Sequence, residues 1–174
     1  AQLSKYTFPF DIKTSFHGNR SSLTLSNLQL QAENMFKATA NATLQDLDKN
    51  LKWMLELKEL GATSKMLSTF FPKIAQQSPF QHFTNLKLKG LARGVQQDFN
   101  IDGQWASNLG ELKFRLHKEK NNYNGTLETI ELSLDKLLKR KDLGNITSRL
   151  ELKDFQRYSN HSKFLLKGDI SKID

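Results

Sequence analysis

Histidines are the residues of this chain whose type most often serves acid–base catalysis or metal binding. The chain has four of them, His17, His82, His117 and His161. They stand far apart, in expected turns or at polar strand positions, and none has a partner at a metal-site spacing such as H-x-x-x-H. The histidines therefore predict neither a catalytic centre nor a metal site.

Other reactive groups give no stronger signal. Asp46 with Asp48 and Glu128 with Glu131 are pairs of carboxylates, but their positions are typical of turns and of the outer side of a strand. The sequence contains no cysteine, which excludes disulfides, thiolate metal sites and a cysteine nucleophile. It also lacks the G-x-S-x-G, P-loop and dinucleotide fingerprints. We predict a protein that is not an enzyme and that needs no cofactor.

The charge of the chain raises the question of an anionic partner. Lysine and arginine total 26 against 18 acids, a net charge of +8, which suits nucleic acid, anionic lipid or a membrane surface. In LKFRLHKEK, however, Lys113, Arg115 and His117 alternate with apolar residues, so the bases and the aromatic side chain lie on opposite sides of a strand. A surface for single-stranded nucleic acid needs both on one side. We predict no nucleic-acid partner and interpret the basic residues as a solvated strand face.

Five asparagines begin an N-x-S/T triplet: Asn19, Asn41, Asn124, Asn145 and Asn160. Such triplets can mark glycosylation in a secreted protein. They also arise where asparagine, serine and threonine fill turns and polar strand faces. Both interpretations remain open at this point.

The elements that would position any site are strands. Apolar residues alternate with polar ones along most of the chain, which is the period of a half-buried strand, and about ten short strands are expected. A phase slip at Asn27 indicates a bulge. The predicted apolar lining of one common face is Leu51, Trp53, Leu55, Leu86, Leu88, Phe99, Ile101, Trp105, Leu112, Phe114, Leu116, Leu150, Leu152, Phe164 and Leu166.

Two stretches change to helical spacing. They lie near 62–71, where Pro72 should end or bend the helix, and near 134–140, where LDKLL carries three leucines. Each is flanked by strands, so 50–90 and 124–153 are interpreted as two strand–helix–strand repeats. We expect residues 1–174 to form a single β-rich segment of a longer chain.

The expected fold is mainly β: an elongated, curled antiparallel sheet, shaped like a trough, with two short helices. A sheet with one apolar face must cover that face. Either the face curls around an apolar ligand, or the sheet folds over into a closed β-sandwich, for example a glycan-binding module. Trp53 and Trp105 separate these alternatives, because a trough turns both toward the ligand, whereas a sandwich buries one or displays it at a loop edge.

The region NYNGTLETIELSLDKLLKRKDLGNITSRLELK resembles the repeats of large bacterial envelope proteins of the TamB and AsmA-like kind. The matching residues are Gly125 to Glu128, Leu132 to Leu138, Asp142 to Gly144 and Thr147 to Lys153. FNIDGQWASNLGELKF and NLKLKGLARG are similar to strand repeats of the same family. The resemblance covers roughly residues 50–170.

The resemblance implies a setting and a role. Members of that family are anchored in the inner membrane and extend through the periplasm as a curved β-sheet trough with a hydrophobic inside. They are implicated in outer-membrane biogenesis, by lipid transport between membranes or by assembly of outer-membrane proteins. We therefore expect a periplasmic segment of a membrane-anchored chain, with phospholipid or another acyl-chain lipid as its partner and an outer-membrane assembly protein as a further one.

Overall fold

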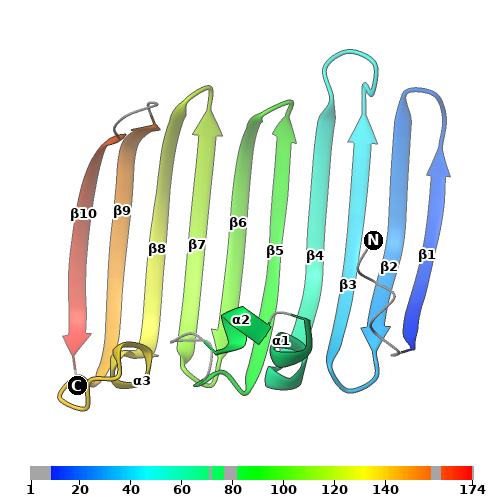
Figure 1. The fold of residues 1–174 in the computed structure, drawn as a ribbon. Coiled ribbons are helices and arrows are strands. Elements are labelled where there is room, and N and C mark those ends of the chain that lie inside the picture. The colour runs from blue at the N-terminus through cyan, green and yellow to red at the C-terminus, as the bar shows by residue number, and fades with distance from the viewer. Residues whose placement is uncertain (1–8, 71, 77–81, 158–161, 174) are drawn as a thin grey trace.

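In the computed structural model, residues 9–70, 72–76, 82–157 and 162–173 are described. They contain one ten-stranded sheet whose strands follow one another in chain order, every neighbouring pair antiparallel (Figure 1). The strands are β1 Phe10–Gly18, β2 Ser22–Ala32, β3 Phe36–Gln45, β4 Lys52–Thr63, β5 Asn85–Val95, β6 Asp98–Ser107, β7 Gly110–Glu119, β8 Asn122–Ser133, β9 Asn145–Arg157 and β10 Ser162–Ile173. The sheet is not closed, and the predicted mainly β fold is confirmed.

Helices occur where the spacing of apolar residues changes from alternation to helical spacing. α1 is Ser64–Phe70 and α3 is Leu134–Leu138, close to the predicted ranges, and a four-residue helix, α2 Pro72–Ala75, begins at the proline after α1. All three lie at the same end of the sheet (Figure 1). We call this the helix end, and the opposite end, where β3–β4, β5–β6 and β7–β8 turn, the open end.

The register places alternate residues of neighbouring strands on a common side. One row across β4 to β9 is Leu57, Gly90, Gly103, Phe114, Leu127 and Leu150. The next row toward the open end is Leu55, Ala92, Ile101, Leu116, Gly125 and Leu152. The side that carries these rows is the apolar face. The other side, with Lys89, Asp102 and Arg115, is the polar face.

The helices lie on the apolar face. The Phe83 ring, in the segment before β5, packs edge-on against Trp105 of the apolar face, with 5.1 Å between ring centroids. Phe70 of α1 lies 5.8 Å from Phe10 of β1. Strands are spaced about 4.8 Å apart, so β1 and β4 would stand about 14 Å apart in a flat sheet. The contact therefore joins α1, which follows β4, to the first strand of the sheet.

Burial is concentrated at the helix end. Met35 and Leu109 are fully buried, and both lie in turns between strands at that end. Ala32, Ala62 and Phe83 are also buried near the helices. In the described residues the single sheet has no second sheet packed on it. The helices therefore cover only those apolar side chains that lie at the helix end.

The same pattern of backbone hydrogen bonds is found at the ends of β4 and β8, both at the helix end. The Thr63 amide donates to the Met35 carbonyl over 2.9 Å, and the Ser133 amide donates to the Leu109 carbonyl over 2.8 Å. One residue further on, Ser64 donates to Thr84 and Leu134 to Gly144, each acceptor directly preceding the next strand. The range 50–90 thus contains β4, α1, α2 and the first half of β5, and the range 124–153 contains most of β8, α3 and most of β9.

Three strands contain an extra residue in the left-handed region, Asn27, Glu131 and Asp154, with φ of 53°, 49° and 52°. The register shifts beside each of them, so these are β-bulges, as predicted at Asn27. A neighbouring strand satisfies each bulged amide. Asn41 Oδ1 accepts from Asn27, Thr147 Oγ1 from Glu131 and Asn124 Oδ1 from Asp154.

Candidate apolar binding face

The structure brings almost all of the predicted lining residues onto one face. Those on the apolar face are Trp53, Leu55, Leu86, Leu88, Phe99, Ile101, Trp105, Leu112, Phe114, Leu116, Leu150, Leu152 and Leu166. Leu51 directly precedes β4 at the open end, where its carbonyl accepts from the Gln96 amide over 2.7 Å. Phe164 is in β10, and its side chain lies outside what the structure describes.

Much of this face is open to solvent. Leu55 is 44% exposed and Leu166 is 54% exposed, and toward the margins Phe16 reaches 75%. A soluble monomer seldom leaves so continuous an apolar surface bare, and surfaces of this kind usually mark an interaction site. The face is therefore the leading candidate for a functional surface in the described part of the chain.

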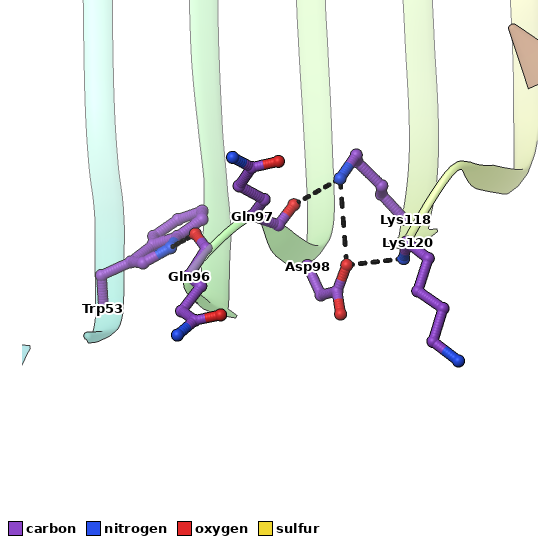
Figure 2. Close-up of polar contacts among 6 residues, drawn as sticks. All are labelled: Trp53, Gln96, Gln97, Asp98, Lys118 and Lys120. Atoms are coloured by element: carbon purple, nitrogen blue, oxygen red, sulfur yellow. Dashed lines mark hydrogen bonds and ion pairs between the residues drawn. The ribbon is translucent and has the colours of Figure 1, made fainter. Parts of the chain in front are cut away.

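The two tryptophans lie on this face at opposite ends. Trp105 is covered by Phe83 at the helix end, and its Nε1 is buried without a hydrogen-bond partner. Trp53 lies at the open end, where its Nε1 donates to the Gln96 carbonyl over 3.3 Å (Figure 2). The closed sandwich needs a second sheet, but the described residues form one sheet. That alternative is therefore wrong as an account of this part of the chain.

Glycines allow aromatic rings to lie flat across the face. A Cβ at Gly103 would stand 2.2 Å from Cζ of Phe114, its partner on β7, and one at Gly94 would stand 2.8 Å from the Trp53 ring. Rings that lie over glycines fill the apolar face without projecting from it. The Phe114 and Trp53 rings thus occupy the space above these two glycines.

Sequence reasoning left several members of this face unassigned. Ile12, Phe16 and Leu25 continue it through β1 and β2, where bulges interrupt the alternation. Lys118 was also missed. It continues the phase of Leu112, Phe114 and Leu116, and the register pairs it with Phe99 and Tyr123. The period-2 phase of β7 alone would have found it.

The polar face carries cross-strand ion pairs. Arg115 Nε lies 3.0 Å from Asp102 Oδ1, and Arg149 lies 3.2 Å from Glu128. Lys113, Arg115 and His117 do stand opposite the apolar side chains of β7, as the alternation predicted. A shallow depression of about 510 Å³ among these strands is lined by charged residues that include Lys89, Lys113 and Glu128. Exposed pairs of this kind contribute little stability, about 0–1 kcal/mol each.

Polar clusters offer no alternative centre in the described residues. His117 Nδ1 lies 2.7 Å from Asn100 Oδ1, and among the residues that the structure describes no group of three or more histidines and carboxylates could hold a metal ion. His161 lies outside the described residues. Near α3, the hydrogen bond from Arg140 holds the pKa of the Asp142 carboxyl below its ordinary value, with a smaller contribution from a backbone hydrogen bond. Both groups are fully exposed.

The asparagines of the N-x-S/T triplets have structural partners. Asn19 Oδ1 accepts from the amides of Ser21 and Ser22 in the β1–β2 turn, and Asn41 and Asn124 bind bulges. Asn145 Oδ1 accepts from the Ser133 hydroxyl where α3 begins. Asn160 lies outside the described residues. Turn and strand chemistry thus accounts for four of the five triplets.

None of the helices in the described residues is both long and apolar enough to cross a membrane. Comparisons with protein-family models, with curated proteins and with solved structures found no match to this chain.

Proposed function

We propose that this chain is a non-enzymatic lipid-binding segment whose apolar face accommodates the acyl chains of phospholipid. The cellular setting of the proposal comes from the TamB and AsmA-like residue pattern between Gly125 and Lys153. In that setting the segment is periplasmic, belongs to an inner-membrane-anchored chain, and takes part in outer-membrane biogenesis through lipid transport or through assembly of outer-membrane proteins.

The observation that carries the proposal is the uncovered apolar face. Ten strands at about 4.8 Å spacing extend over roughly 45 Å, and the apolar rows run across strand after strand. Among the residues that the structure describes, a second layer lies over the helix end, where Phe83, Phe70 and the helices supply it. A linear acyl chain suits such a surface because it makes no demand for hydrogen bonds.

The energetic scale is sufficient. Burying one CH₂ group stabilises a complex by about 0.8 kcal/mol, so an acyl chain with a dozen CH₂ groups in contact gains about 10 kcal/mol. Association costs several kcal/mol in lost freedom, and a surplus for reversible binding remains. Reversibility is what transfer between membranes requires.

The first experiment is native mass spectrometry of the purified chain expressed in a bacterium, with organic extraction of what it carries. Phospholipid in a defined stoichiometry supports the proposal. A lipid-free monomer, or a lipid-free dimer with the two apolar faces joined, contradicts it.

A matched pair of variants in β7 tests the face itself. Leu116→Arg places a charge on the apolar face, whereas His117→Arg places the same side chain one residue along, on the polar face. We expect Leu116→Arg to lose co-purified lipid and His117→Arg to keep it, while circular dichroism shows a folded sheet in both. If Leu116→Arg unfolds the chain, the face is an ordinary core and the proposal fails.

The polar face should be dispensable for lipid binding. Lys87, Lys89 and Lys113 lie on it, exposed and close to one another. Replacing all three by glutamine should leave the bound lipid unchanged in the same mass spectra. Loss of lipid would instead assign binding to the polar face.

A further inference from the structure

Lys118 places a charged side chain on the apolar face of the described strands. The register pairs Lys118 with Phe99 on β6 and with Tyr123 on β8, in the row nearest the open end. The same row contains Trp53, Gly94 and Phe155. We call Trp53, Phe99, Tyr123 and Phe155 the aromatic row.

The Lys118 side chain is held along the surface and is not extended into solvent. It is only 12% exposed, and its Nζ lies 6.0 Å from the centroid of the Phe99 ring and 5.9 Å from that of Tyr123. Both distances are within the range of cation–π attraction. The aliphatic stem therefore covers apolar surface while the ammonium reaches the edge of the face.

The ammonium keeps unused capacity to donate hydrogen bonds. It donates to the Gln97 carbonyl over 2.8 Å, and Asp98 Oδ1 stands 3.8 Å away (Figure 2). That carboxylate oxygen is closer to the Lys120 amide, which donates to it over 2.6 Å. A lysine ammonium has three N–H groups, so Lys118 can bind a further acceptor that arrives along the apolar face.

Hydrogen bonds connect the turns around Lys118. Gln96 joins the β5–β6 turn to the residues before β4, through its amide to Leu51 and its side chain to Asn50 over 2.9 Å. Asp98 joins the same turn to the β7–β8 turn through Lys120 (Figure 2). The ammonium thus has a fixed position, which lowers the entropic cost of binding a ligand.

The space between Lys118 and the covered end matches one acyl chain. Six residues of β7 separate Lys118 from Leu112, which is about 20 Å of strand, and Leu112 pairs with Trp105, the residue under Phe83. Half of a bilayer's hydrocarbon core is about 15 Å thick. A chain that starts at Lys118 therefore ends before the helix end.

The open end also carries a tryptophan and a tyrosine on the apolar face. Aromatic side chains with one polar atom suit the boundary between hydrocarbon and water. Trp53 and Tyr123 are side chains of this kind.

We propose that Lys118 and the aromatic row form a subsite for the phosphate of an acyl-chain lipid, which binds with its headgroup at the open end and its chain directed toward the helix end. This inference rests on the proposed function. It predicts the direction in which the lipid lies on the face and a preference for an anionic headgroup. An apolar surface alone provides neither.

The test measures binding of three myristoyl probes that differ only in their heads: myristoyl lysophosphatidate, monomyristoylglycerol and myristate. The wild-type chain, Lys118→Met, Lys118→Arg and Lys120→Met are titrated below the critical micelle concentration of each probe. Lys120→Met is the matched control. Lys120 is exposed at the same end of the sheet, and this substitution also removes one positive charge.

We expect Lys118→Met to weaken lysophosphatidate binding at least about tenfold, while its affinity for monomyristoylglycerol stays within about twofold. Lys118→Arg should restore most of the lysophosphatidate affinity, and Lys120→Met should change it little. Equal losses for both lipids, or equal losses from both lysine-to-methionine changes, overturn the subsite. A loss for myristate as large as for lysophosphatidate overturns the assignment to phosphate.

The proposed function has a separate outcome in the same titrations. If the wild-type chain binds monomyristoylglycerol without preferring lysophosphatidate, the subsite is wrong and the apolar face still binds acyl chains. If the wild-type chain binds none of the three probes, the proposed function fails together with the subsite.

Discussion

The two ends of the sheet are built from the same strands and have different packing. At the helix end, Met35 and Leu109 are fully buried beneath short helical connections. Toward the open end, Leu55 in the row of Ile101 and Leu116 is 44% exposed. The comparison teaches that the covered end stabilises the sheet, and that the rest of the apolar face is available for a ligand.

The largest difference between the ends should appear when one leucine is truncated at each. Leu109→Ala removes a fully buried side chain and should lower the free energy of unfolding by about 3 kcal/mol. Leu116→Ala, on the next strand and toward the open end, should cost about 1 kcal/mol or less. Urea unfolding followed by circular dichroism measures both. Equal losses would show that the open end is packed in solution as tightly as the helix end.

A glycine in the middle of the sheet should show how far packing extends from the covered end. A Cβ at Gly103 would meet the Phe114 ring, whereas one at Gly61 would meet nothing within 4 Å. We expect Gly103→Ala to destabilise the sheet by about 1–2 kcal/mol through overpacking. Gly61→Ala is the control and should be neutral or slightly stabilising. Similar melting temperatures for the two variants would mean that the Phe114 ring moves freely.

The sequence predicted most strands and two of the three helices in the described residues because the spacing of apolar residues differs between strands and helices. Asp102-Gly103 illustrates the limit, because this pair of residues is common in tight turns, whereas the alternation from Phe99 through Ile101 to Trp105 favours a strand. The structure places Gly103 inside β6, where the Phe114 ring lies over it. Pairing across strands decided the matter, and no local pattern contains that information.

The candidate site was less predictable than the fold. Alternation assigned the lining leucines and aromatics to a face, but it could not show that only one sheet forms or that helices cover one end of it. Met35 and Leu109 are buried in turns before β3 and β7, and their carbonyls accept hydrogen bonds from the amides of Thr63 and Ser133. Those contacts join residues distant in sequence, so they follow from the order of the strands.

The bulges offer a comparison in which the two ends should behave alike. Asn124 satisfies the bulged amide of Asp154 toward the open end, and Thr147 satisfies that of Glu131 toward the helix end. We expect Asn124→Ala and Thr147→Val each to lower the free energy of unfolding by about 1 kcal/mol, the usual net value of one hydrogen bond. Urea unfolding measures it. A cost confined to Thr147→Val would show that the bulge at the open end needs no partner.

The smallest expected effect belongs to the exposed turn after α3. Arg140 donates to Asp142 and lowers the pKa of its carboxyl in the folded chain. A lowered pKa in the folded chain means that the interaction stabilises the chain at pH values above the ordinary carboxyl pKa of about 4. That stabilisation is lost as the pH falls through the pKa of the folded chain.

Because both groups are fully exposed, Asp142→Asn should leave the unfolding transition at neutral pH nearly unchanged. Carboxyl resonances followed by NMR should show the Asp142 carboxyl titrating below its ordinary pKa, and Arg140→Gln should raise that pKa most of the way to the ordinary value. An Asp142 pKa that does not respond to Arg140→Gln would mean that the backbone hydrogen bond sets it, and that the turn after α3 keeps its shape without the ion pair.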